Sequence, residues 1–294
     1  DIAENPDFAI RIFGSAQASY TTHENFSHFR QTVGQRSSYI IIDAPEWSDV
    51  HNDIQWLMNA ENDKDDIRNN PQWLYKGASG FDRHNQALCY NGNGDEKQTS
   101  YKRGENTERD RMLQVMLDKI IVQLKKCPIQ RLVTISCQDN YEWCHCNLCQ
   151  QQASDYGAKS ASPLIFMGDL ADLAYEWMAS EEGKPYAVDD LEFVMLAYHE
   201  VLSAPDPDKF DLHNKIAIWY APVGMDYTKS VYTDVNQEYL KTFYSWLEFD
   251  PGLALWLYET NFRYNYMVPY DTFNAVRDLC QFYSVWDVKY IFTQ

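Results

Sequence analysis

Eight short apolar runs, separated by helix-like segments, constrain the fold of this chain more than any other feature. Most of the runs are unbroken rather than alternating, which is typical of parallel strands that are covered on both faces. Strands that alternate with helices predict a parallel sheet, and eight of them predict an α/β fold closed into a (β/α)8 barrel of the TIM type. The runs are 8–13, 39–43, 87–90, 132–137, 191–198, 215–220, 254–258 and 288–292.

Amphipathic helices are predicted between these strands. The clearest covers 108–126, where apolar residues recur at helical spacing and Thr107 is the expected N-cap. The next covers 163–179, with Ser162 as the expected N-cap and Pro163 in the first turn. Two further stripes are Leu240, Phe243, Tyr244 and Leu247, and Phe273, Val276, Cys280 and Tyr283.

We predict a single barrel domain over residues 1–294. The long polar region at about 47–102 is expected to be a decorated loop excursion between the second and third strands, because Gly, Asn and Asp punctuate it. The sequence stops directly after the eighth predicted strand. The final helix of the barrel is therefore expected to be missing or replaced by other chain.

Charge and composition narrow the choice of partner. The formal net charge is -18 and no basic run is longer than Lys125-Lys126, so we expect neither nucleic acid nor an anionic membrane surface as a partner. No stretch approaches the roughly 20 apolar residues of a membrane-spanning segment. Aromatic residues make up 15% of the chain, and the faces of Trp and Tyr suit stacking on sugar rings. A carbohydrate is the partner that we expect; nothing in the sequence indicates an oligomeric state.

Acidic residues follow several of the predicted strands. The carboxyl ends of parallel strands meet at one edge, where chemistry is usually placed. Asp139 follows the fourth strand, Glu200 the fifth and Glu259 the seventh. Glycoside hydrolysis needs two such groups, one protonated and one ionised, so these three are the candidate catalytic residues. Solvated surface charge, or capping of the strand end by Asp139 and Asn140, remains the alternative.

Polar and aromatic side chains beside these acids are the candidates for substrate binding. Their aromatic faces would stack on a sugar and their polar groups would bind its hydroxyls. The glycine-rich motifs of nucleotide binding and the serine elbow of esterases do not occur, and the proposed hydrolysis requires no cofactor. The substrate-binding candidates are Asn140, Trp143, Tyr198, His199, Tyr220, Tyr258, Asn261 and Arg263.

Closely spaced cysteines follow the fourth strand, in the run CQDNYEWCHCNLC at 137–149. Three thiolates with a fourth ligand can bind a structural zinc ion tetrahedrally. A disulfide within the loop and reduced packing thiols remain alternatives, and the total of seven cysteines does not fit an evenly paired framework. In each case the thiols are expected to fix the loop that carries Asp139. The candidate metal ligands are Cys137, Cys144, Cys146 and Cys149.

The run LVTISCQDNYEWCHCNLC resembles the bacterial family labelled domain of unknown function 4838 (DUF4838). The pattern of that family is a strand, a polar residue, Asp-Asn and a C-x-C-x2-C cluster. Nearly the whole chain is similar to the family, in order. The other similar segments are NNPQWLY at 69–75, ALCYN at 87–91, LAYHEVLSAP at 196–205, WLYETNF at 256–262 and the closing VWDVKYIFTQ.

This resemblance implies a glycoside-hydrolase-like TIM barrel, distantly similar to the family 67 α-glucuronidases, in an exported bacterial protein. It implies a hydrolase that acts on a polysaccharide or a glycan-derived oligosaccharide. Two departures favour the alternative, a non-catalytic carbohydrate-binding barrel with a cysteine-stapled loop. Leu257 stands where an acid is expected, and Asn-Pro-Gln-Trp at 70–73 replaces His-Pro-Glu-Trp.

Overall fold

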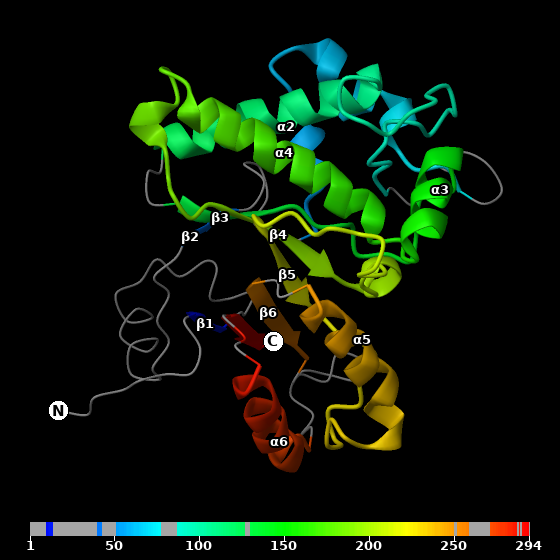
Figure 1. Ribbon diagram of the computed structural model, residues 1–294, viewed down its shortest axis with the longest axis vertical. Coiled ribbons are helices and arrows are strands. Elements are labelled where there is room, and N and C mark those ends of the chain that lie inside the picture. The colour runs from blue at the N-terminus through cyan, green and yellow to red at the C-terminus, as the bar shows by residue number, and fades with distance from the viewer. Residues whose placement is uncertain are drawn as a thin grey trace. The chain divides into compact units, whose positions relative to one another are not determined.

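The fold is described by a computed structural model, shown in Figure 1. It describes residues 10–13, 40–42, 51–77, 87–126, 130–249, 252–258, 271–286, 288 and 290–293. The chain divides into two compact units. Unit 1 comprises Asp1–Tyr39 and Ile218–Gln294, and unit 2 comprises Ile40–Ala217. Both contain parallel strands and helices, so the predicted α/β class is confirmed.

The strands of unit 2 pair in parallel. β2 (Ile40–Ile42) lies beside β3 (Gln130–Thr134), with Ile42 opposite Val133. β3 in turn lies beside β4 (Glu192–Ala197). The described side chains of β3, and those of β4 after its first residue, are buried, as expected for parallel strands with both faces covered. Because all three strands run the same way, the loops that leave them emerge at one edge of the sheet.

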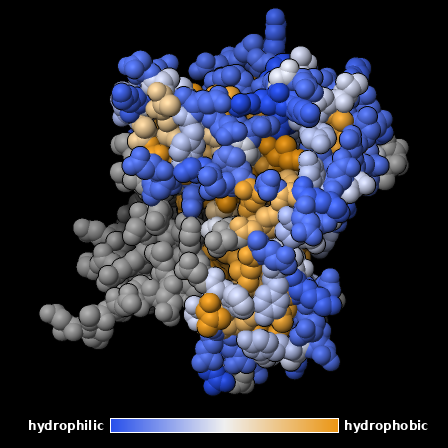
Figure 2. Space-filling model, viewed as in Figure 1, coloured by the Kyte–Doolittle hydropathy of each residue, from blue (hydrophilic) through white to orange (hydrophobic). Residues whose placement is uncertain are grey.

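A layer of helices packs on these strands. α2 (Thr107–Lys126) and α4 (Ala161–Ala179) lie side by side, and α4 also contacts β4 (Figure 1). α3 (Asn147–Tyr156) contacts α4. The apolar stripes of α2 and α4 face inward and are buried, whereas the outer surface of this layer is mostly hydrophilic on the face that Figure 2 shows. In the described part of the chain, the helices all fall short of the length and apolarity that crossing a bilayer requires.

The ends of these helices differ from the predictions. Thr107 is not the N-cap of α2, because the helix already includes it and the side chain of Asn106 accepts a hydrogen bond from Arg109 N (3.1 Å). Ser162 also lies inside its helix, and its hydroxyl donates to Gln152 Oε1 (2.8 Å). At α2 the side chain of Asn106 takes the capping position, whereas α4 begins after Ser160, whose side chain makes no capping hydrogen bond.

The described residues of the excursion before α2 include four one-turn helices. They are η2 (Gln55–Leu57), η3 (Asp63–Asp65), η4 (Ile67–Asn69) and η5 (Pro71–Trp73). The strand predicted at 87–90 is wrong. Leu88 forms only an isolated antiparallel bridge with Leu74, and Cys89 N donates to Trp73 O (2.8 Å). This segment is apolar because it is buried within the excursion, beside residues 73–75, and not because it belongs to the parallel sheet.

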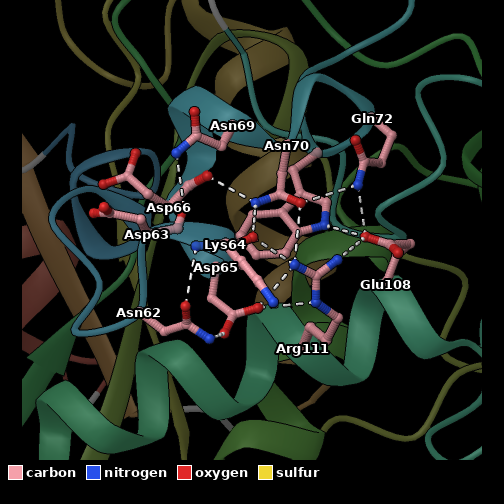
Figure 3. A network of polar contacts seen from close by, with 11 residues as sticks. Asn62, Asp63, Lys64, Asp65, Asp66, Asn69, Asn70, Gln72, Glu108 and Arg111 are labelled. Atoms are coloured by element: carbon pink, nitrogen blue, oxygen red, sulfur yellow. Dashed lines mark hydrogen bonds and ion pairs between the residues drawn. The ribbon is translucent and has the colours of Figure 1, made fainter.

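A polar network fixes the excursion on α2 (Figure 3). The guanidinium of Arg111 donates to Asp65 Oδ1 (2.8 Å) and to Glu108 Oε2 (2.8 Å). The same Glu108 oxygen accepts from Gln72 Nε2 (2.7 Å) and from Trp73 Nε1 (2.9 Å). Charge-assisted bonds of this kind are stronger than neutral ones. The Pro-Gln-Trp segment is therefore a structural contact with α2.

The described strands of unit 1 are also parallel. β7 (Tyr290–Thr293) lies between β1 (Ile10–Phe13) and β6 (Gly252–Leu257). Thus the first of the described strands pairs with the last of them. β5 (Ile216–Tyr220) is fully buried and begins in unit 2 and ends in unit 1. Each of these strands has a counterpart among the predicted runs.

Aromatic side chains hold the helices of unit 1 together. α5 (Gln237–Leu247) and α6 (Phe273–Ser284) contain the two predicted stripes. The buried face of α6 differs from its stripe: it comprises Ala275, Leu279, Phe282 and Tyr283, whereas Phe273 is 87% exposed. The ring of Phe243 lies 5.4 Å from that of Phe282 and 5.0 Å from that of Tyr283, between centroids. Such tilted and edge-to-face pairs stabilise a core beyond the apolar area that they bury.

Candidate functional site

Three of the predicted site residues meet where β3 and β4 end. Asp139 lies in the loop after β3, and Tyr198 and His199 follow β4 directly. The hydroxyl of Tyr198 donates to Asp139 Oδ1 (2.9 Å), and His199 Nε2 lies 3.7 Å from the same oxygen. The Asp139 side chain is 65% exposed, against 8% for His199. The carboxylate is therefore held from one side and open to solvent on the other.

Aromatic rings surround the His199 imidazole. Its centroid lies 3.6 Å from that of Tyr198 and 4.0 Å from that of Tyr141, and the ring of His51 lies 5.3 Å from Tyr198. Burial lowers the pKa of His199, although the nearby Asp139 carboxylate opposes this shift. The imidazole is thus neutral near pH 7 and can donate or accept one proton.

The backbone of His199 is strained. Its φ is 43°, in the left-handed region that residues with a Cβ rarely adopt. Such a conformation costs roughly 1–2 kcal/mol and persists only where the surroundings impose it. Strain of this kind concentrates at functional sites, so the backbone independently marks the end of β4 as a candidate site.

A buried polar group anchors the residue before Asp139. Gln138 Nε2 donates to Asp53 Oδ1 (2.6 Å) and to the carbonyl of His51 (3.1 Å). The other oxygen of Asp53 accepts from the hydroxyl of Tyr90 (2.8 Å). Burial raises the pKa of Asp53 to about 6, against the hydrogen bonds from Gln138 and Tyr90. No sequence pattern indicates this group, because Asp53 is one of many acids in a polar excursion.

Glu200 and Asn140 have partners of their own. Glu200 forms an ion pair with Lys159, whose ammonium also lies over the ring of Trp143, 5.2 Å from its centroid. Asn140 Oδ1 accepts from Glu142 N (3.0 Å). That bond is the local turn-capping role that the sequence left open for the Asp-Asn pair.

The remaining predicted catalytic and substrate-binding residues belong to unit 1. Tyr220 is buried and its hydroxyl donates to the carbonyl of Tyr239 (2.7 Å). Tyr258 stacks on Trp256, with 6.1 Å between ring centroids. Three candidates lie outside the described residues: Glu259, Asn261 and Arg263.

Four cysteines come together in unit 2. The sulfur atoms of Cys89, Cys144, Cys146 and Cys149 all lie within 4.8 Å of one another, and all four side chains are buried. None of these four cysteines forms a disulfide. The group could therefore hold a metal ion. The fourth thiol of this group is Cys89 and not, as predicted, Cys137.

Local geometry explains why Cys137 is not a member. It lies in the loop after β3, where its carbonyl accepts from His51 Nδ1 (2.9 Å) and the residue is only partly buried. Cys89 reaches the other thiols because the excursion folds back on itself through the bond from Cys89 N to Trp73 O. A contact between residues so far apart in the chain has no signature in cysteine spacing.

The pKa values of Cys89, Cys146 and Cys149 are shifted by burial and by neighbouring thiols. Burial raises the pKa of Cys89, and a hydrogen bond with Cys144 raises that of Cys149. Hydrogen bonds from Cys144 and Cys149 lower the pKa of Cys146. Because the thiols lie close together, hydrogen bonds from neighbouring thiols favour a thiolate at Cys146.

Fold and site together define the class of this molecule: an α/β protein with parallel strands, a strained His and an exposed Asp at neighbouring strand ends, and a buried four-cysteine cluster. The chain belongs to the family described as domain of unknown function (DUF4838), whose family model matches residues 2–294. This confirms the family that the Asp-Asn and cysteine motifs indicate. Neither the curated proteins nor the solved structures gave a match.

Proposed function

We propose that the protein is an exported glycoside hydrolase that acts on a polysaccharide or a glycan-derived oligosaccharide, with Asp139 as one of its two carboxylates. The observation that carries this proposal is the setting of Asp139. It follows a buried parallel strand, is oriented by the Tyr198 hydroxyl and remains mostly exposed. An oriented but accessible carboxylate can approach the anomeric carbon of a sugar or a water molecule next to it.

The second carboxylate is proposed to be Glu259. Glu200 is the other candidate, but Lys159 already holds it in an ion pair. Glu259 follows β6 at the end of a buried strand, the position from which barrel enzymes present catalytic groups. His199 would bind sugar hydroxyls or orient Asp139, because its imidazole nitrogen lies 3.7 Å from that carboxylate.

Closure of the strands into a TIM-type barrel, as one domain, is part of this proposal. Among the described strands, the first pairs in parallel with the last, within unit 1, as closure of a barrel requires. Parallel pairing continues through β2, β3 and β4 within unit 2. Since 87–90 is not a strand of this sheet, an eighth strand would come from residues outside the described ranges.

The alternative is a carbohydrate-binding barrel without catalysis, and one observation favours it. Leu257 ends β6 and is buried where the family pattern has an acid. The other departure does not weaken the case for catalysis. Asn70 and Gln72 lie in the excursion, where they bind the carbonyl of Asp66 and the Glu108 carboxylate. Their change from His and Glu therefore alters a structural contact and not a strand end.

A hydrolysis screen tests the proposal. The wild type and Asp139→Asn are assayed on plant and host glycans, including glucuronate-bearing ones, with Asp189→Asn as an exposed control outside the strand-end loops. We expect Asp139→Asn to lower turnover by roughly 10²–10⁴-fold at an unchanged melting temperature, and the control to retain activity. Sugar binding without turnover in the wild type would establish the alternative instead, and full activity of Asp139→Asn would refute the role of this residue.

A further inference from the structure

The spacing of the four buried sulfurs matches a metal centre and not a disulfide. Cys89 Sγ lies 3.7 Å from Cys146 Sγ and 3.9 Å from Cys149 Sγ. Four sulfurs at the usual Zn–S distance of about 2.3 Å form a tetrahedron with edges of about 3.8 Å. A disulfide would need one pair to close to about 2.05 Å. These two separations, and the 4.8 Å within which all four sulfurs lie, fit a tetrahedral thiolate site.

Polar N–H groups surround the cluster in the way that metal-bound thiolates require. Three N–H groups donate to three different sulfurs, which stabilises negative charge on sulfur and fixes its direction. Two of them come from buried asparagine residues, so these donors are unavailable to water. The bonds join Lys76 N to Cys144 Sγ (3.3 Å), Asn93 N to Cys89 Sγ (3.2 Å) and Asn91 Nδ2 to Cys149 Sγ (3.2 Å).

An apolar shell encloses the sulfurs. The cluster shares its core with Tyr75, Ala87 and Leu148, and each of the four cysteines is at most 2% exposed. A buried thiolate without a partner is costly, so thiolates in this shell need a cation. The thiolates are soft ligands, which suit zinc and disfavour magnesium or calcium.

From these observations we propose that Cys89, Cys144, Cys146 and Cys149 bind one zinc ion as a structural tetrathiolate centre. Binding releases to solvent one proton for each thiol that ionises, and no group is oxidised or reduced. Four protein ligands leave no open position on the ion, so the centre is structural and takes no part in hydrolysis.

The centre would fix the loop that carries Asp139. That loop is held at its start by β3 and, through Cys144 and Cys146, at its end. Cys89 belongs to the excursion that docks on α2, so the ion would join the strand-end loop to the helical layer. This role does not depend on the reaction proposed for Asp139, because it concerns the rigidity of the loop alone.

The proposed zinc centre is tested by measuring the zinc content of the protein and the number of thiols that react as zinc is released. The full chain is purified without added metal and its zinc is measured by mass spectrometry, with about one zinc ion expected per chain. Titration with an organomercurial should release this zinc as four thiols react. Cys89→Ser and Cys146→Ser should lose the zinc, whereas Cys137→Ser and Cys280→Ser, matched controls outside the cluster, should retain it.

A second measurement covers the case in which the cluster variants fail to fold. Wild-type protein is stripped with a chelator and refilled with Co²⁺, whose absorption spectrum reports tetrahedral thiolate coordination. We expect that spectrum in the wild type and in Cys137→Ser. Iron in place of zinc, disulfides among the four cysteines, metal-free protein with no Co²⁺ spectrum, or loss of metal from Cys137→Ser alone would overturn the proposal.

Discussion

The hydroxyl of Tyr198 donates a hydrogen bond of 2.9 Å to Oδ1 of Asp139, and so joins the loops that leave two adjacent parallel strands. This bond orients a carboxylate that is otherwise open to solvent. Tyr198→Phe removes the bond and keeps the ring.

We expect Tyr198→Phe to lower turnover about tenfold while changing the free energy of unfolding by only about 1 kcal/mol. Steady-state kinetics and urea unfolding measure the two effects, with Tyr232→Phe, an exposed tyrosine of unit 1, as the control. Equal activity of Tyr198→Phe and the wild type would show that this bond does not position Asp139.

The buried carboxyl of Asp53 predicts an unusual dependence of stability on pH. Burial raises its pKa from 3.8 to about 6, so between these values the folded protein binds more protons than the unfolded chain does. Linkage then requires that the contribution of Asp53 to the free energy of unfolding falls as pH rises from about 4 to about 6, by about 3 kcal/mol in all.

Asp53→Asn should remove this contribution, because an amide of the same shape does not ionise. We expect the stability of the variant relative to the wild type to increase between pH 4 and pH 6 and to remain level above pH 7. Urea unfolding of both proteins across this range measures the difference. Two parallel pH profiles would exclude a raised pKa for Asp53.

An alanine variant is usually more stable than a glycine variant, but the strained backbone of His199 predicts the opposite order at this position. At a φ of 43°, glycine relieves the strain that alanine retains. We therefore expect His199→Gly to be more stable than His199→Ala by about 1 kcal/mol, as measured by urea unfolding. A more stable alanine variant would mean that the left-handed conformation is not imposed at this position.

The bonds from Arg111 to Asp65 and Glu108 are expected to determine how firmly the excursion is attached to α2. Arg111→Lys keeps the charge but loses the fork that binds Asp65 and Glu108 together. We expect a loss of about 1–2 kcal/mol in the free energy of unfolding, together with faster proteolysis within 55–75. Arg277→Lys, an exposed arginine in unit 1, is the control. If both variants resist the protease equally, the network of Figure 3 does not hold the excursion.

Much of the fold could be predicted because its signals are local. The spacing of apolar residues identifies α2, α4, α5 and α6, and unbroken apolar runs identify the parallel strands. The meeting of Asp139 with Tyr198 and His199 follows from a general rule, since parallel strands end at one edge. Local pattern and sheet geometry together were sufficient for these elements.

The errors concern contacts between distant segments. A short apolar run such as 87–90 looks the same whether it enters a sheet or is buried beneath an excursion, so periodicity could not separate the two. Cys89 and Asp53 owe their roles to neighbours far along the chain, Cys146 and Gln138. α3 was missed because it is short and its first residues lie within the run 137–149, which reads as a metal-binding loop.

The union of Cys89 with Cys144, Cys146 and Cys149 also sets an order of events during folding. α2 and β3 lie between these cysteines in the chain, so the sulfurs meet only after a long stretch has been synthesised and compacted. Closing so distant a contact is slow compared with forming a helix. In a nascent chain that does not yet include Cys149, the cysteine cluster cannot form and the excursion stays exposed. Completion of the cluster would then depend on how soon the remaining thiols are synthesised in reduced form.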